Sequence, residues 1–192
     1  MRKLIASEYV SLDGIMQDPG GVGEFKHGGW TSPYWNDELA IFKNEELFGS
    51  DGLLLGRATY EGFAAAWPDM SHEEGEYADR MNGFPKYVVS RTLSNLTWNN
   101  SHLLSGGLDG EVRKLKEQPG QDLLIFGSGQ LVRSLMQLDL IDEYRLQVYP
   151  VVVGSGKRLL GDDDNFKTLQ LAETKPLESG VVILTYRASS HS

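Results

Sequence analysis

Two short glycine-containing turns could do chemistry, because each separates an apolar run from a helical pattern. The first turn follows the apolar residues 53–55 and contains Gly56, Arg57, Ala58 and Thr59. The second turn follows residues 123–126 and contains Gly127, Ser128, Gly129, Gln130 and Leu131. Glycine lets the backbone approach a ligand closely, and the free N–H groups at a helix N-terminus attract anions. Both turns are therefore candidate phosphate-binding sites.

Each turn also has an ordinary structural interpretation. Residues 56–61 can be a plain helix start in which Thr59 or Glu61 caps the first turn. Residues 127–131 can be a tight strand–helix connection, and they are shorter than the dinucleotide fingerprint because residue 132 is Val and not Gly. Neither turn identifies a ligand by itself.

A third candidate site follows the apolar run at 87–89, where the chain continues with Ser90 and Arg91. The planar fork of an arginine side chain matches the oxygens of a phosphate group. A solvated strand end is the alternative interpretation of this pair.

The elements that position these turns alternate between strands and helices. Apolar runs predict strands over residues 3–10, 53–55, 87–89 and 123–126, and helical spacing predicts helices over 36–48, 58–66, 111–117 and 131–138. Strand patterns then follow one another at 144–153, 166–173 and 181–186. We therefore expect a three-layer α/β fold over residues 1–187, with a mostly parallel sheet, an antiparallel C-terminal edge, helices on both faces and a disordered tail at 188–192.

Composition excludes several classes of function. The 192 residues include 18 Lys and Arg against 27 Asp and Glu, a net charge of −9 that disfavours nucleic acid as a partner. The absence of cysteine excludes disulfides, zinc–thiolate sites and thiol catalysis, and the four histidines show no metal-ligand spacing, so no metal is expected. Because no signal peptide or membrane span is evident, we expect a cytoplasmic protein that does not associate with membranes.

The ordered motifs resemble a known superfamily. Residues 35–43, Trp-Asn-Asp-Glu-Leu-Ala-Ile-Phe-Lys, followed by residues 54–61, Leu-Leu-Gly-Arg-Ala-Thr-Tyr-Glu, resemble dihydrofolate reductase. Residues 11–14, 141–146 and 150–154 are similar to the pyrimidine reductase domain of riboflavin biosynthesis. The two families share a fold, and the resemblance spans roughly residues 3–187, so the chain is expected to be a stand-alone bacterial member of this superfamily.

The resemblance implies NADPH as cofactor and assigns the three turns to it. Residues 56–59 match the segment that holds the cofactor phosphates, and Ser90 and Arg91 match the strand end that binds the adenosine 2′-phosphate. Residues 127–131 match the glycine turn against the pyrophosphate. The glycine-rich segment 14–30 corresponds to a mobile loop that closes over the nicotinamide, although a plain connection is the alternative.

Three acidic residues are candidates for the catalytic carboxylate. Glu38 matches the buried acid of dihydrofolate reductases through the shared Leu-Ala-x-Phe-Lys register, and Asp37 is the competing choice if the gap is placed differently. An acid at a helix N-terminus also has a purely structural interpretation, because it is favourable to the helix dipole. Asp13, at the end of the first strand, either contacts substrate or sets the turn with Gly14.

The sequence therefore predicts an NADPH-dependent reductase that transfers a hydride to a pteridine, a ribosylaminopyrimidine or a similar flat heterocycle. A binding module for NADPH or a folate-like ligand, without turnover, is the alternative, and a scaffold without nucleotide affinity is a third possibility. Residues 27–30 fit no dihydrofolate reductase motif, and a zinc deaminase domain of the riboflavin type is excluded without cysteine. The β-rich C-terminal part favours a homodimer.

Overall fold

A single mixed sheet runs through the whole computed structural model, which describes residues 1–70, 75–161 and 166–189. Within these residues the strand order is β4-β3-β2-β5-β1-β6-β8-β7. Neighbouring strands from β4 to β6 run parallel, and β8 is antiparallel to both β6 and β7. The bounds are β1 Leu4–Ser11, β2 Ser50–Gly56, β3 Lys86–Val89, β4 Ser101–Leu104, β5 Asp122–Phe126, β6 Glu143–Tyr149, β7 Leu169–Pro176 and β8 Val182–Ala188.

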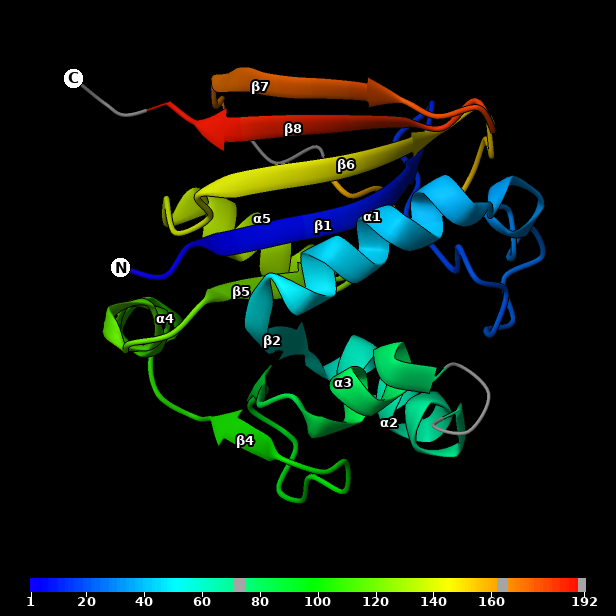
Figure 1. The fold of residues 1–192 in the computed structure, drawn as a ribbon. Helices are drawn as coiled ribbons and strands as arrows, with labels where there is room; N and C mark the ends of the chain where they lie inside the picture. The colour runs from blue at the N-terminus through cyan, green and yellow to red at the C-terminus, as the bar shows by residue number, and fades with distance from the viewer. Residues whose placement is uncertain (71–74, 162–165, 190–192) are drawn as a thin grey trace.

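Helices cover both faces of this sheet, which confirms the expected three-layer α/β architecture (Figure 1). Residues from the first three helices pack on one face, and residues from the last two pack on the other. The helices are α1 Asp37–Phe48, α2 Arg57–Met70, α3 Gly75–Gly83, α4 Leu108–Glu117 and α5 Gly129–Gln137, preceded by the short 3-10 helix η1 Ser32–Tyr34. No helix among the described residues is long and apolar enough to span a bilayer.

Helix α1 begins where the sequence provides a cap. The side chain of Asn36 accepts a hydrogen bond from the Leu39 backbone N–H at 3.0 Å, which satisfies one free donor of the first turn. The buried positions of α1 follow at helical spacing, but two of the four are charged, Lys43 and Glu46. The helix therefore brings a polar patch, as well as Leu39 and Leu47, against the sheet.

Several predicted boundaries are wrong for identifiable physical reasons. Strand β6 ends at Tyr149 and not at 153, because Pro150 has no N–H for the ladder. Helix α2 continues past the expected stop at 66 and contains Pro68 in its last turn. There Phe63 and Trp67 of the helix pack against the core, which favours continuation of the helix. The C-terminal strands are also shifted: β7 begins at 169 instead of 166.

Three elements were not predicted at all: the short 3-10 helix η1, helix α3 and strand β4. Helix α3 is short and mostly charged, and only two of its residues, Ala78 and Met81, are buried. Strand β4 is a four-residue edge strand without a fully buried side chain. Of the expected tail, Ala188 is the last residue of β8 and Ser189 donates a hydrogen bond to the Thr168 carbonyl at 3.1 Å, while residues 190–192 lie outside the described part.

Candidate active site

The two glycine turns meet at the carboxyl edge of the sheet. Strands β2 and β5 are parallel neighbours, so the turns that follow them emerge side by side. The Gly56 N–H donates to Ser128 Oγ at 2.9 Å, and the Ser128 N–H donates to Thr59 Oγ1 at 2.9 Å. Ligands of open α/β sheets bind beyond this edge. The structure thus joins two segments, 72 residues apart in sequence, into one candidate site.

Two helix N-termini start within this site and leave their first turns free for an anion. Helix α2 begins immediately after Gly56, and α5 begins at Gly129. Neither helix has an acidic residue in its first turn, and the Ser128 side chain does not cap α5. Gly127 and Ser128 have positive φ angles of 58° and 56°, which turn the chain sharply from β5 into α5. This arrangement fits a bound phosphate or pyrophosphate group.

Arg57 joins the turn at 56–59 to the segment that follows β3. Arg57 Nη1 donates to Thr92 Oγ1 at 2.9 Å, and its Nε pairs with Glu61 at 3.2 Å. Ser90 is buried, and its hydroxyl accepts hydrogen bonds from the backbone N–H groups of the two residues after Arg91. Arg91 itself is exposed. The structure therefore places Ser90 and Arg91 beside the turn at 56–59. We call these two residues, together with Arg57 and Thr92, the polar rim.

The glycine-rich segment 14–30 packs against the second turn. A Cβ atom added at Gly129 would lie 2.3 Å from Met16 Sδ, so glycine permits this close approach. Hydrogen bonds close the base of the segment: the Gly29 N–H donates to the Asp18 carbonyl at 2.9 Å, and Trp30 Nε1 donates to the Gln17 carbonyl at 2.9 Å. The segment is thus anchored at both ends and touches the glycine turn through Met16.

The carboxylate of Asp13 accepts hydrogen bonds from the backbone. Its two carboxylate oxygens accept hydrogen bonds from the N–H groups of Val153 at 3.1 Å and Gly154 at 2.7 Å. The Ser11 hydroxyl donates to the same carboxylate at 2.6 Å, and these bonds lower the pKa of Asp13 to about 2. The ionised side chain therefore holds the segment after β6 against the end of β1.

Among the described residues, neither Glu38 nor Asp37 has a hydrogen bond to the three turns. Glu38 Oε2 accepts hydrogen bonds from the Glu178 backbone N–H at 2.7 Å and from Asn36 Nδ2 at 3.3 Å. Because Glu178 belongs to the connection between β7 and β8, Glu38 faces the antiparallel edge of the sheet. Asp37 is exposed. The catalytic roles of both acids stay predictions.

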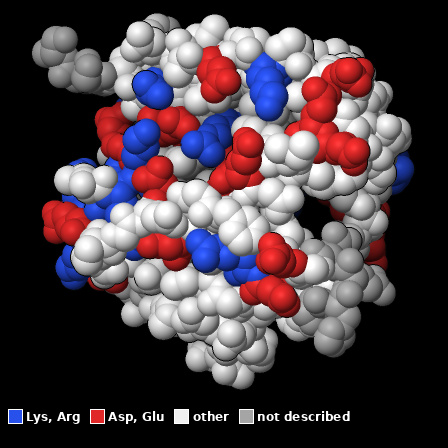
Figure 2. Space-filling view, in the orientation of Figure 1, with Lys and Arg blue, Asp and Glu red and all other residues white. Residues whose placement is uncertain are grey.

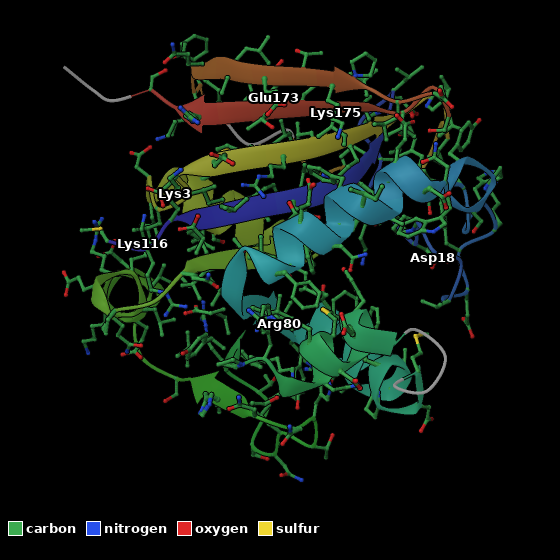
Figure 3. All side chains as sticks on the ribbon, viewed as in Figure 1. Lys3, Asp18, Arg80, Lys116, Glu173 and Lys175 are labelled. Carbon is green, nitrogen blue, oxygen red and sulfur yellow. The ribbon has the colours of Figure 1, made fainter. Side chains whose placement is uncertain are left out.

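A polar groove of about 460 Å³ lies over the antiparallel edge, bounded by α1 and by β6, β8 and β7. Acidic and basic side chains lie side by side over much of this face in Figure 2, and acidic ones gather at its upper right. Lys3, Glu173 and Lys175 line the groove and extend over the strands in Figure 3. This groove is separate from the glycine turns, and the largely exposed β7 is the last strand of the sheet within the described residues.

One buried polar group beside the glycine turn was missed by sequence reasoning. Glu8 is 2% exposed on β1, and it follows Ser7, which pairs with the last residue of β5. Nearby, Lys43 Nζ donates to Glu46 Oε2 at 2.5 Å and to Ser7 Oγ at 3.1 Å. A glutamate in the middle of an apolar strand was the available signal, because such residues are seldom buried without a reason.

Comparisons with known proteins agree with this architecture. The RibD C-terminal domain family matches residues 2–183. The uncharacterized protein YyaP of Bacillus subtilis (strain 168) is 29% identical over 187 residues, which cover 96% of this chain and 94% of that protein.

Two solved structures share the fold. One is a putative riboflavin biosynthesis protein from Shewanella sp. PV-4, with a TM-score of 0.67, 18% identity and coverage of 97% of this chain and 99% of that one. The other is dihydrofolate reductase from Enterococcus faecalis, complexed with NADP(H), with a TM-score of 0.61, 15% identity and coverage of 98% and 97%. The family match over nearly the whole length, together with this fold, shows that the chain belongs to the RibD C-terminal domain family, a family of reductase-like domains.

Proposed function

We propose that this protein is an NADPH-dependent reductase that transfers a hydride to a flat heterocycle, such as a pteridine or a ribosylaminopyrimidine. The observation that carries the proposal is the direct contact of the two glycine turns through Ser128, with Gly56 on one side and Thr59 on the other. This contact brings two helix N-termini to one place, which suits the two phosphates of a dinucleotide.

Different groups of this chain would bind different parts of the cofactor. Backbone N–H groups at the start of α5 would bind the pyrophosphate, with the positive φ angles of Gly127 and Ser128 forming the turn that presents them. The start of α2 would complete this cradle, and Arg57, already oriented by Thr92, would add a positive charge. The bound cofactor would supply the hydride, while the segment 14–30 excludes water from the site through its contact at Met16.

Preference for NADPH over NADH would depend on the polar rim after β3. Arg91 is exposed there, next to the buried Ser90 hydroxyl, and a guanidinium group pairs well with a 2′-phosphate. A net charge of −9 opposes the binding of any anionic cofactor, so such local donors are needed.

For the proton that accompanies the hydride, we retain Glu38 as the candidate donor, with Asp37 as the alternative. Asp13 is less suited to this role, because its hydrogen bonds stabilise the ionised form and keep its pKa near 2. Because Glu38 already accepts a hydrogen bond from the Glu178 N–H, it is less available as a proton donor. This favours, as a second candidate function, a module that binds NADPH or a folate-like ligand without turnover. A homodimer and a cytoplasmic location remain predictions.

Calorimetric titration with NADPH and NADH tests the cofactor site. We expect Arg91→Ala to weaken NADPH binding by about tenfold to a hundredfold, the effect of losing a hydrogen bond to a charged group, and to leave NADH binding nearly unchanged. Arg113→Ala is the matched control, because Arg113 is an exposed arginine of α4 whose Nε pairs only locally with Asp109. Equal losses in the two variants would reject the assignment of Arg91.

The substrate is then sought by following NADPH oxidation with dihydrofolate, a ribosylaminopyrimidinone and related heterocycles. Turnover of one of them would support the reductase. Binding of NADPH without oxidation across the panel would favour the binding module, and no binding of either nucleotide would reject both in favour of a scaffold.

A further inference from the structure

Glu8 lies where β1 passes the end of β5. Ser7 pairs with Phe126, the last residue of β5, so the next residue on β1 lies beside Gly127, the first residue of the glycine turn. The Gly127 backbone N–H acts on the Glu8 carboxyl and lowers its pKa, although burial outweighs this effect. The acid therefore lies beside the turn that the proposed function assigns to the cofactor pyrophosphate.

The second oxygen of this carboxyl is unsatisfied. Glu8 Oε1 is buried and has no hydrogen-bond partner among the described residues. A buried polar atom without a partner costs about 1–3 kcal/mol, so such atoms are rare unless a ligand completes them. Because both oxygens belong to one carboxyl group, Oε1 also lies at the junction of β1 and the glycine turn.

The basic group that acts on Glu8, Lys43, is already bonded to another carboxylate. From α1, Lys43 attracts the carboxylate and Glu46 repels it, but Lys43 Nζ is already bonded to Glu46 at 2.5 Å. Tyr9 is the neighbouring titratable group on β1 itself.

Burial is the largest influence on this acid, and it raises the pKa of Glu8 well above its ordinary value. The attraction of Lys43 and the Gly127 N–H act in the opposite direction but are smaller. A neutral carboxylic acid differs from a carboxylate in having a donor, O–H, which an anionic ligand can accept. A carboxylate in the same place would repel a pyrophosphate group.

We propose that Glu8 is a cofactor-binding residue, a neutral acid whose Oε1–H donates a hydrogen bond to a pyrophosphate oxygen held at the glycine turn. This inference rests on the proposed function and adds a residue that recognises the cofactor as an anion. Gly127 would then lie between the acid and the ligand, since its positive φ angle forms the turn that follows β5.

Difference infrared spectroscopy tests the proposal without measuring turnover. We expect wild type at neutral pH to show the C=O band of a protonated carboxyl that is absent from Glu8→Gln. Saturating NADPH should move this band to lower frequency, and 2′-phospho-ADP-ribose, which keeps the pyrophosphate but lacks nicotinamide, should do the same. Glu45→Gln, a change of an exposed glutamate on α1, should behave as wild type.

Calorimetry supplies the second readout. Glu8→Leu should weaken NADPH binding about tenfold to a hundredfold, whereas Glu8→Gln, which keeps a donor through its amide, should bind within a few-fold of wild type. Thermal unfolding of each variant checks that it is folded, and Glu8→Gln keeps the test decisive if Glu8→Leu is not.

A missing carboxyl band would mean that Glu8 is ionised, and a band unmoved by bound NADPH would mean that the acid is only structural. A band moved by NADPH but not by 2′-phospho-ADP-ribose would place the acceptor on the nicotinamide. Each result would overturn the proposal while leaving the NADPH site intact. By contrast, failure of wild type to bind NADPH at all would reject the proposed function itself.

Discussion

The contact between Met16 and Gly129 gives a sharp test of how the loop and the glycine turn fit together. A Cβ atom at Gly129 would lie 2.3 Å from Met16 Sδ and 3.2 Å from its Cε, so Gly129→Ala forces the methionine side chain to move. Because these atoms are the far end of a flexible side chain, the shift is cheap, and we expect it to cost about 1 kcal/mol of unfolding free energy. Alanine recovers up to about 1 kcal/mol through its higher helix propensity. The two effects nearly cancel, so we expect Gly129→Ala to change the free energy of unfolding by less than about 1 kcal/mol.

A double-mutant cycle with Met16→Ala isolates the steric part. Without the thioether the added methyl group meets only an ordinary contact with Arg133, so Gly129→Ala should become stabilising in that background, a coupling of about 1 kcal/mol. Urea unfolding of the four proteins measures it. Gly62→Ala is the control, because Gly62 lies in α2 and an added Cβ there has no neighbour within 4 Å. Equal costs of Gly129→Ala in both backgrounds would refute the packing of the loop on the turn.

Two further predictions concern the same edge of the sheet. Thr59→Val removes the acceptor of the Ser128 N–H and should cost about 1–3 kcal/mol in urea unfolding and weaken NADPH binding; unchanged affinity would contradict the role of this contact. Asp13→Asn should destabilise the protein at neutral pH, because the ionised carboxylate accepts the Val153 and Gly154 N–H groups. Since folding lowers the pKa of Asp13 from its ordinary value to about 2, this stabilisation is present above about pH 4 and is lost as the pH falls toward 2. The gap between wild type and Asp13→Asn should therefore close over that interval in unfolding measured against pH, and a constant gap would contradict it.

Local sequence was sufficient to predict the strand–turn–helix units that carry the candidate site. The apolar runs before Gly56 and Gly127 end at residues that break a strand, and helical spacing starts directly after them. These signals are contained within about ten residues, so no distant contact is needed to interpret them. Helix α3 and strand β4 were missed for the opposite reason: they bury few residues of their own and depend on neighbours for stability.

The alternation of strands and helices also predicted a parallel sheet with an antiparallel edge, and the structure confirms it. What sequence could not provide was the set of contacts between the turns. Ser128 contacts Gly56 and Thr59 across about 70 residues of chain, and Arg57 reaches Thr92 from another strand end. Such pairs depend on strand order, which periodicity does not encode.

The difference between local sequence and long-range contacts also explains the positions of Glu38 and Glu8. Sequence register singled out Glu38, but the position of α1 directs it to the β7–β8 connection, because a helix rotates each residue to a fixed side. Glu8 carried no motif, and only the pairing of β1 with β5 buries it beside Gly127. Sequence alone thus determined the residue types and local turns of this protein, whereas tertiary structure decided which groups meet, since burial and long-range pairing arise only when the sheet assembles.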